Sequence, residues 1–553
     1  MENIQILYVL VAFIIISLII KYSNKRRFLR DIRRSFGKFP VYEFKKADDA
    51  KVLSQSFYSL LKNENQKVII DDVTWRDLDL MKVFNKINAS RSTIGADALY
   101  YRLRTIDRDE NDSSSISKIL DYFDKNEDKR VEAAYYFYKL GKIQDKSIIA
   151  FLDNVDKEKS NLFLHLVMGL IPIVTLLLAI FNVTNMALPV FLLSIIINAF
   201  YTLKKKDTID TEMKYINYVT NSVNTSKKLI KMGIPIKPNL ITEIDKLKFT
   251  NALSSINKPT SGNTGELMGY YISVISMLLF ISYDISSRKT INNLDSIKKL
   301  WLDIGDVEAA LCILNYREAV QEYCIPDFTE DKNIVATNVY HPLLKNAVKN
   351  DVDWNRTTLV SGSNASGKST YVKSIAINAI LAQTIYTCLA DKFIMRKGNV
   401  ITAMAVKDDI IEGDSYFIAE IKALKRITDD VEANNFSYYF IDEILKGTNT
   451  VERISASSSI ISYFIKYDCL AFVATHDIEL TKIYEKEAKN IHFRELFTDD
   501  NKIEFDYKLY QGPSTTTNAI KLLKIVDFPH EIVENAEENV ENFNKTKSWY
   551  QEE

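Results

Sequence analysis

The chain is poor in cysteine, histidine, proline and glycine. Its 553 residues include only 4 cysteines, 5 histidines, 10 prolines and 15 glycines. The cysteines are far apart and form no Cys-x-x-Cys pair: Cys312, Cys324, Cys388 and Cys469. This spacing indicates neither a structural metal site nor a disulfide framework, so we expect a reducing compartment. Few prolines and glycines beside 47% hydrophobic residues exclude a linker-rich chain and favour helix-rich folded domains.

The chain also lacks a net charge of either sign. Its 71 lysines and arginines nearly cancel 72 aspartates and glutamates, which leaves a formal charge of -1. No overall positive field therefore attracts nucleic acid, and a local basic groove would be needed to bind it. The length has room for about three to four domains.

Charge and apolar residues are unevenly placed at the N-terminus. An apolar run from Ile4 to Ile20 is followed at once by the basic stretch from Lys21 to Arg34. A signal peptide has the reverse order of charge and apolar residues, so a cleaved signal is the weaker alternative. We interpret 4–20 as an N-terminal transmembrane anchor with its basic side in the cytoplasm.

A second apolar block extends from Leu162 to Leu203 and is interrupted at 182–185. Lysines flank both ends, so the pattern predicts a transmembrane hairpin with spans at 162–181 and 186–203 and both ends cytoplasmic. The alternative is a buried hairpin of a soluble domain. A further apolar segment, 267–283, is interpreted as a buried helix of the soluble part, because a fourth span would place the phosphate loop described next outside the cell.

Residues 362–369 form a complete G-x-x-x-x-G-K-[ST] phosphate loop between a short apolar strand and a helix-compatible segment. Gly362 and Gly367 allow backbone N–H groups to turn toward phosphate oxygens. Lys368 supplies charge to the β- and γ-phosphates, and the Ser369 hydroxyl is the expected Mg²⁺ ligand. A chance Gly/Ser loop is the alternative, and the strand and helix on either side argue against it. The predicted phosphate contacts are Gly362, Ser363, Asn364, Ala365, Ser366, Gly367, Lys368, Ser369 and Thr370.

Two further apolar strands end in residues suited to nucleotide hydrolysis. Ser437 to Ile441 leads into Asp442 and Glu443, where the first carboxylate can orient Mg²⁺ and the second can polarise a water. The strand from Cys469 to Thr475 delivers His476 to the sheet edge where ligands sit. Each signal alone is weak, but their order after a phosphate loop favours a nucleotide site.

These motifs together resemble the MutS-like ATPases, relatives of the ABC ATPases. The resemblance covers about 336–540 and continues upstream in shorter matches. The matching stretches are 340–344, 361–371, 381–383, 408–420, 441–450, 475–480 and 528–533, with 72–80, 92–103 and 303–310 upstream.

The resemblance implies an α/β C-terminal P-loop (ABC-type) ATPase domain preceded by a mostly α-helical core and lever domain with transmembrane helices. We accordingly expect an anchor and basic juxtamembrane segment at 1–60, the helical domain at 61–335 and the ATPase domain at 336–553. Where the family carries its DNA clamp, this chain has the predicted membrane hairpin. No match to the family's mismatch-recognition domain precedes Asp71, so we expect that domain to be absent.

Residue roles follow from the same resemblance. It implies ATP and Mg²⁺ as cofactors, Asp442 and Ser369 as magnesium ligands, Glu443 as catalytic base and His476 as sensor of the γ-phosphate. Ser415 matches the signature loop that reaches the nucleotide of the opposite subunit, which implies a homodimer. The family's adenine-stacking aromatic is replaced by Ala347, and Asp414 stands where the signature loop usually has a positive or polar residue.

Three functions are consistent with these patterns. The first is an ATPase in the cell membrane, multi-pass and with its ATPase domain cytoplasmic, whose dimer closure moves the helical levers. DNA is an optional partner in that reading. The second is a mismatch-repair or recombination protein that binds mismatched or branched DNA. A transporter-type ATPase is the third, and the absence of a Leu-Ser-Gly-Gly-Gln signature argues against it. The basic segments beside the apolar runs favour contact with membrane lipid over DNA.

Overall fold

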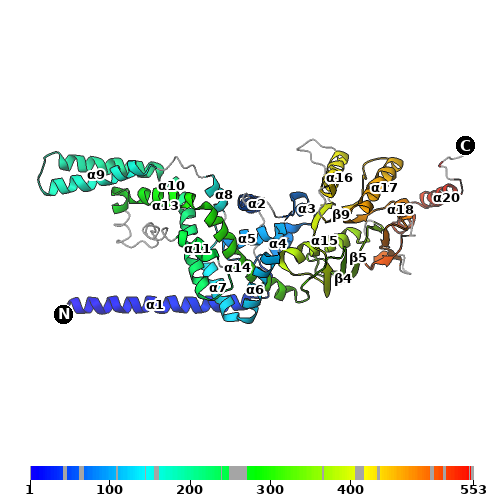
Figure 1. Ribbon diagram of the computed structural model, residues 1–553, viewed down its shortest axis with the longest axis horizontal. Helices are drawn as coiled ribbons and strands as arrows, with labels where there is room; N and C mark the ends of the chain where they lie inside the picture. The colour runs from blue at the N-terminus through cyan, green and yellow to red at the C-terminus, as the bar shows by residue number, and fades with distance from the viewer. Residues whose placement is uncertain are drawn as a thin grey trace. The chain divides into compact units, whose positions relative to one another are not determined.

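The computed structural model describes residues 2–41, 47–61, 68–106, 110–143, 145–154, 161–237, 239–247, 271–363, 366–404, 416–432, 436–497, 503–514, 519–546 and 549 (Figure 1). The chain divides into two compact units. One comprises residues 1–67, 84–102 and 109–321, and the other comprises residues 68–83, 103–108 and 322–553. The described part of the first unit is helical, and the second holds the main β-sheets. A helical N-terminal region followed by an α/β region agrees with the coarse fold-class prediction.

The helical unit is assembled around one long buried helix, α14. Within α14, Trp301 is fully buried and its indole N–H donates to Asp97 at 3.1 Å. Burial raises the pKa of that carboxyl to about 7. The Lys298 ammonium, also buried, donates to the Ser59 carbonyl at 2.8 Å and pairs with Asp153 at 2.7 Å. The helices that contribute to this unit are α1 (Glu2–Ser35), α2 (Ala47–Leu61), α4 (Leu80–Ile87), α5 (Thr93–Arg104), α6 (Glu110–Lys125), α7 (Glu127–Leu140), α8 (Ile148–Asp153), α9 (Leu162–Ile180), α10 (Ala187–Lys231), α11 (Asn239–Lys246), α13 (Leu278–Asn292) and α14 (Leu294–Val320).

Two glycines allow α5 and α14 to approach closely. A Cβ placed on Gly305 would lie 2.2 Å from the Ala98 Cβ and 2.8 Å from the Ile94 carbonyl oxygen. A Cβ placed on Gly95 would lie 2.0 Å from a carboxylate oxygen of Glu308. The contact between these helices therefore depends on having glycine, with no side chain, at positions 95 and 305.

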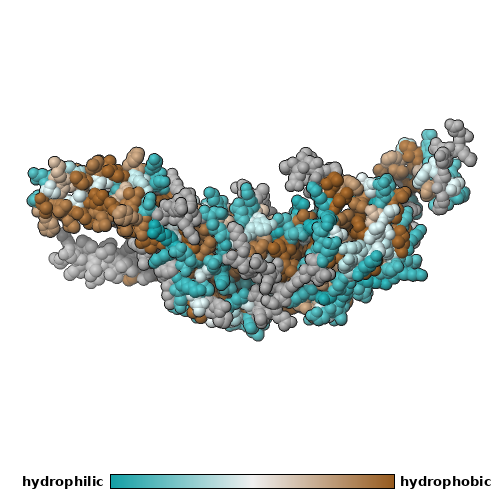
Figure 2. Space-filling model, turned by 45° about the horizontal axis from the view of Figure 1, so that its top comes forward, coloured by the Kyte–Doolittle hydropathy of each residue, from teal (hydrophilic) through white to brown (hydrophobic). Residues whose placement is uncertain are grey.

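The predicted hairpin is present as α9 and the first part of α10, which lie side by side (Figure 1). In the described chain, the segments Leu162–Ile180 and Ala187–Lys205 are long and apolar enough to cross a membrane, with mean hydropathies of 2.5 and 1.7. Only 17% and 22% of these segments is buried, and Figure 2 shows hydrophobic side chains gathered over this arm. A core helix of a soluble protein also meets the length criterion, so membrane insertion stays a prediction.

The helix that holds the second predicted span is longer than the span. The apolar run ends at Leu203, and α10 continues without interruption to Lys231. Residues 204–231 contain no proline or glycine, so nothing in the backbone ends the helix where the apolar run stops. The predicted anchor, 4–20, lies in α1, which also includes the basic stretch that follows.

The segment predicted as a buried helix, 267–283, is described from residue 271. Its backbone is helical at 271–275 and again from the start of α13 at Leu278, with Met277 between them at φ 52°. Met277 and Phe280 are buried against residues of α9 and α10, including Met168, Tyr201 and Met213. The described part of this segment thus packs against α9 and α10 near Met168 and Tyr201.

The α/β unit contains a six-stranded sheet in the order β14-β11-β6-β10-β9-β8 and a four-stranded sheet in the order β3-β7-β4-β5. In the larger sheet every neighbouring pair is parallel except β11 with β14. All side chains of β6 and β10 are buried, which explains the continuous apolar sequence of β10, whereas β6 also buries the hydroxyl groups of Thr358 and Ser361. The strands are β3 (Asp327–Phe328), β4 (Ile334–Val339), β5 (Asn350–Trp354), β6 (Thr358–Ser361), β7 (Lys392–Met395), β8 (Asn399–Ala403), β9 (Ser437–Asp442), β10 (Cys469–Ala474), β11 (Lys489–His492) and β14 (Tyr510–Gln511).

Helices pack against these sheets, and short elements complete the unit. Helix α15 contacts strands of both sheets, whereas α16 and α17 bury Ile427, Ile461 and Phe464 against the larger one. An early segment, α3, joins the sheet at β8, where the Asp77 carboxylate accepts from the Thr402 hydroxyl at 2.8 Å. The remaining elements are α3 (Asp72–Asp77), α15 (Lys368–Ile385), α16 (Tyr416–Glu432), α17 (Thr450–Lys466), α18 (Ile478–Ile483), α19 (Ala519–Ile525) and α20 (His530–Thr546), with the pairs β1 (Val68–Ile69) and β2 (Thr105–Ile106), and β12 (Glu495–Phe497) and β13 (Ile503–Phe505).

The close contact of α5 with α14 predicts that Gly305→Ala lowers the free energy of unfolding by about 1–3 kcal/mol, because the added methyl group overpacks the contact. An alanine in an open helix would instead be favourable by about 1 kcal/mol. Denaturant unfolding of the full chain measures the change. Adding Ala98→Gly removes the nearer clash and is expected to restore part of the loss, and stability equal to wild type in the single variant would contradict the packing argument.

Candidate nucleotide-binding site

The predicted site residues gather at the carboxyl edge of three adjacent parallel strands. Ala474 at the end of β10 lies opposite Val360 of β6 on one side and Asp442 of β9 on the other. Residues that follow these strand ends must therefore meet at one edge of the sheet. The phosphate loop follows β6, Glu443 follows β9 and His476 follows β10.

The loop backbone depends on its two glycines. Gly362 has φ 133° and Gly367 has φ 101°, a region that side chains disfavour. A Cβ on Gly362 would lie 2.5 Å from the Phe493 carbonyl oxygen, and one on Gly367 would lie 3.0 Å from the Tyr507 ring. Gly367 directly precedes α15, so the loop opens at a helix N-terminus, where backbone N–H groups are available to an anion.

Lys368 is the first residue of α15, and its side chain turns back over the loop. Its ammonium donates to the carbonyls of Gly362 at 2.5 Å and Ser363 at 2.8 Å, and it lies 3.3 Å from His476 Nε2. Burial lowers the pKa of Lys368 to about 8, while the nearby carboxylates of Asp442 and Glu443 oppose that shift. The positively charged ammonium thus lies where the negatively charged phosphate groups of a nucleotide would bind.

The residues present fit a Mg²⁺-bound nucleotide. A hydrogen bond joins Ser369 to Asp442, and it partly offsets the burial that raises the pKa of this aspartate. A hydroxyl and a carboxylate are the hard oxygen ligands that Mg²⁺ accepts beside phosphate oxygens and water. The Ser363 hydroxyl is buried and has no hydrogen-bond partner among the described residues, which leaves a polar atom in the loop for a ligand to satisfy.

Glu443 is held between two cationic or polar neighbours. Its carboxylate lies 3.0 Å from His476 Nε2 and 2.7 Å from the Lys446 ammonium. The hydrogen bond with His476 lowers the pKa of Glu443 to about 2, with a further contribution from Lys446. Its backbone has φ 62°, and its N–H donates to the Ala474 carbonyl at 2.9 Å. The carboxylate is therefore ionised, as a group that accepts a proton from water must be.

An ion pair that the sequence reasoning missed supports the His476 segment. Arg453 of α17 binds Asp477 through two hydrogen bonds of 3.0 and 2.7 Å. Such a bidentate pair fixes the position of the residue next to His476. Neither the pair nor the contact of Lys446 with Glu443 has a sequence motif of its own.

A cavity of about 320 Å³ lies beside the loop and is large enough for part of a nucleotide. Its wall includes Ala347, where no aromatic side chain is available for stacking, but the Tyr507 ring lies on the wall as well. Asn350 positions Tyr507 by donating to its carbonyl at 3.0 Å across 157 residues of sequence. The complete lining is His341, Leu344, Asn346, Ala347, Val348, Asn350, Gly367, Thr370, Tyr371, Ser374, Phe493 and Tyr507.

Three predicted site residues, Asn364, Ala365 and Ser415, lie outside the described residues. The remaining predicted residues, Gly362, Ser363, Ser366, Gly367, Lys368, Ser369, Thr370, Asp442, Glu443 and His476, are described. Helix α16, which begins directly after Ser415, is tied to the site because Glu420 accepts from the backbone N–H groups of Lys446 and Gly447 at 3.3 and 3.4 Å. In the described part of the chain, no cluster of three or more His, Cys, Asp or Glu could hold a separate metal ion.

Comparison with known proteins places this site in a family. Residues 358–544 match the model of MutS domain V. The DNA mismatch repair protein MutS of Thermotoga maritima is 29% identical over 265 residues, 45% of this chain and 33% of the relative. That of Lactobacillus gasseri is 32% identical over 247 residues (41% and 28%), and the DNA mismatch repair protein MSH3 of Debaryomyces hansenii is 24% identical over 344 residues (58% and 33%).

A phosphate loop, an Asp-Glu pair and a histidine on adjacent parallel strands define a P-loop nucleotide-binding domain. The match at 358–544 and the similarity to these relatives over about half of the chain support a MutS-family protein, as the sequence motifs predicted. Members of this family are ATPases, and domain V contains their ATPase region. The chain spans about a third of the length of the relatives named above.

The cavity predicts that Tyr507→Ala weakens ATP binding by up to about tenfold, because the stacking contribution of an aromatic ring is lost. Tyr507→Phe keeps the ring and is the matched control, with affinity close to wild type. Equilibrium binding of a fluorescent ATP analogue measures both variants. Unchanged affinity in Tyr507→Ala would show that the base is held elsewhere.

Proposed function

We propose that this chain binds Mg²⁺-ATP at the 362–369 loop and hydrolyses it to ADP and phosphate. The observation that supports this most strongly is the convergence of Lys368, Asp442, Glu443 and His476 at the edge of β6, β9 and β10. Membership of a family of ATPases supports the same conclusion. The proposal accounts for two buried features. Among the described residues, the Lys368 ammonium contacts carbonyls of its own loop and His476, and the Ser363 hydroxyl has no hydrogen-bond partner.

Each side chain has one task in the proposed reaction. Lys368 exchanges its loop carbonyls for the β- and γ-phosphate oxygens, and Ser369 and Asp442 hold Mg²⁺, which neutralises charge on the phosphates. Glu443 orients the attacking water and accepts its proton. For that task Glu443 must give up a contact with His476 or Lys446. If it gives up the contact with His476, the imidazole can turn to hydrogen-bond the γ-phosphate.

A homodimer with two composite sites is the proposed active assembly. The support is the match of Ser415 to the family's signature loop, together with the link of α16 to the Glu443 loop through Glu420. Because Glu420 holds the backbone of Lys446 and Gly447, a displacement of α16 on dimer closure would reach the catalytic base directly. Closure would in turn move helices of the core and lever domain.

Two cellular roles are candidates for this ATPase. The relatives are named DNA mismatch repair proteins, and this favours action on mismatched or branched DNA. The exposed apolar arm of α9 and α10 favours instead a membrane-anchored ATPase with lipid as a partner. The relatives' names give the DNA role the stronger support, and the arm supplies a physical reason to test a membrane location beside it.

The proposed chemistry predicts different defects for two site variants. Lys368→Ala is expected to lose nucleotide binding or hydrolysis, because no other ammonium contacts the described part of the loop. Glu443→Gln is expected to retain ATP binding and to lower kcat by about 10²–10⁴-fold, since the amide cannot accept a proton. Steady-state ATPase assays and nucleotide binding measure both, with Lys482→Ala on the exposed face of α18 as control. Normal turnover in either site variant would overturn its assignment.

The DNA role predicts that mismatched or branched DNA raises the ATPase rate of the detergent-purified chain more than homoduplex DNA does. The affinity should fall steeply as salt rises, because phosphate contacts release counterions. A rate unchanged by every DNA at every salt concentration would contradict the DNA role and leave the membrane-anchored ATPase. Cofractionation with membranes after high-salt and alkaline washing tests that location separately.

A further inference from the structure

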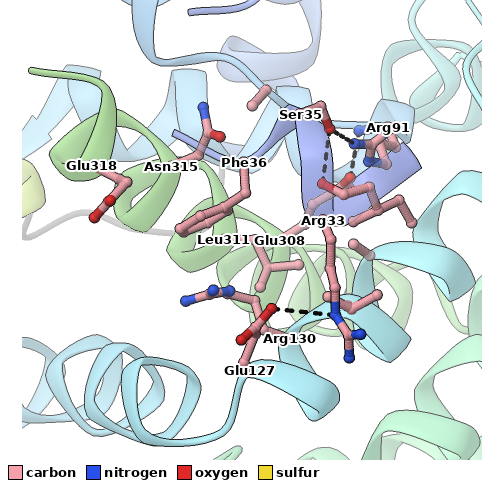
Figure 3. A pocket seen from close by; sticks show the side chains of 14 residues that line it. Arg33, Ser35, Phe36, Arg91, Glu127, Arg130, Glu308, Leu311, Asn315 and Glu318 are labelled. Carbon is pink, nitrogen blue, oxygen red and sulfur yellow. Dashed lines mark hydrogen bonds and ion pairs between the residues drawn. The ribbon is translucent and has the colours of Figure 1, made fainter. Parts of the chain in front are cut away.

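The helical unit contains a cavity of about 240 Å³ that takes no part in the nucleotide site (Figure 3). The end of the basic half of α1 forms one wall, α7 and α14 form two others, and the segment near Arg91 completes it. A water molecule takes about 30 Å³ in the liquid, so the cavity has room for a group the size of phosphate with several waters.

One arginine in this cavity has no side-chain hydrogen bond to any described residue. The Arg130 guanidinium makes no hydrogen bond or ion pair with any described residue, and its Nε is fully buried. Its guanidinium carbon lies 3.7 Å from the centre of the Phe36 ring, so the ring holds the group in place without satisfying its N–H donors. Burial lowers the pKa of Arg130, although the carboxylates of Glu127, Asp124 and Glu318 oppose the shift, and burying its Nε without an acceptor remains costly.

A second arginine that lines the same cavity uses few of its hydrogen-bond donors. Among the described residues, the Arg91 guanidinium donates one hydrogen bond, to the Ser35 hydroxyl at 3.2 Å. Desolvation by burial lowers the pKa of Arg91, even though Glu308 opposes the shift. An arginine presents five N–H donors in a planar fork, so most of its hydrogen-bonding capacity is unused here.

Three acidic residues line the cavity, Glu127, Glu308 and Glu318, and two of them, Glu308 and Glu127, bond to groups other than these donors. Glu308 is 2% exposed and accepts from the Ser92 hydroxyl and the Arg91 backbone N–H, not from a guanidinium. Burial raises the pKa of Glu308 to about 7, although hydrogen bonds from Ser92 and the Arg91 backbone oppose the rise. Glu127 is paired with Arg33 at 3.2 Å, as Figure 3 shows.

We propose that this cavity binds a terminal phosphoryl group, with Arg91 and Arg130 donating to its oxygens. A phosphoryl group offers several acceptor oxygens in different directions, which suits two guanidinium forks from separate elements. The ring of Phe36 and the side chain of Leu311 line the same cavity and would contact the carbon portion of the ligand. The phosphoryl group belongs either to a phosphatidic acid headgroup or to a soluble phosphate, and a bound ligand would fasten α1 to α7 and α14.

The test measures thermal unfolding of the full chain in detergent at constant ionic strength. All proteins carry Lys368→Ala, so that the phosphate loop cannot account for a shift. The ligands are inorganic phosphate, soluble short-chain phosphatidic acid, and short-chain phosphatidylcholine, whose phosphate is capped. Arg130→Gln is the test variant. Lys129→Gln is the matched control, because it removes the same charge from the neighbouring residue of α7, which pairs with Glu132.

Phosphate or phosphatidic acid is expected to raise Tm in the parent and the Lys129→Gln control, and the apparent Kd should weaken by about tenfold or more in Arg130→Gln. A shift with phosphatidic acid alone identifies a lipid headgroup as the source, and a shift with inorganic phosphate at least as large as that with phosphatidic acid identifies a soluble phosphate. No shift with either ligand, or an equal shift in Arg130→Gln, overturns the proposal. If Arg130→Gln does not fold, Arg91→Gln replaces it with the same expectation.

Discussion

The register of three parallel strands, β6, β10 and β9, determines where the chemistry of this protein can occur. Val360, Ala474 and Asp442 lie side by side at the strand ends, so the segments that follow them emerge at one edge. The phosphate loop and His476 come from positions more than 100 residues apart, and the Asp442-Glu443 pair lies between them in the sequence. A shift of one residue in this register would turn the side chains at the strand ends to the opposite face of the sheet. Buried apolar side chains on both faces of β10 hold the register in place.

The sequence predicted those parts of the site whose functional residues lie close together in the chain. The phosphate loop needs glycines, a lysine and a hydroxyl within eight residues, so its motif is legible without the fold. Tyr507 could not be found in this way, because tertiary contacts bring it to the cavity from a distant segment. Asn350 donates to the Tyr507 carbonyl and accepts from the Leu509 N–H. The pair of Arg453 with Asp477 likewise depends on how α17 packs beside the turn after β10.

The helical region was predicted less completely for a similar reason. Hydropathy located the apolar arm to within about a residue at its start, but it could not show that α10 continues beyond Leu203. Beyond Leu203, the side chains of Ile209, Met213 and Ile216 are buried in one cluster with residues of α13, which is distant in sequence. The arm is joined to α13 by polar contacts as well, since buried His165 of α9 lies 2.6 Å from Asp284 and 3.0 Å from the Tyr201 hydroxyl. Buried polar groups of this kind align the helices that carry them.

The unbroken course of α10 has a mechanical consequence. At about 1.5 Å per residue, its 45 residues extend for about 68 Å. After Pro189 near its start, the helix has no proline or glycine at which a sharp kink would form. A tilt of about 5° at one end would therefore displace the other end by about 6 Å, without bending in between. The apolar arm and the polar core segment are two ends of one stiff rod, and the surroundings of either end restrict the orientation of the other.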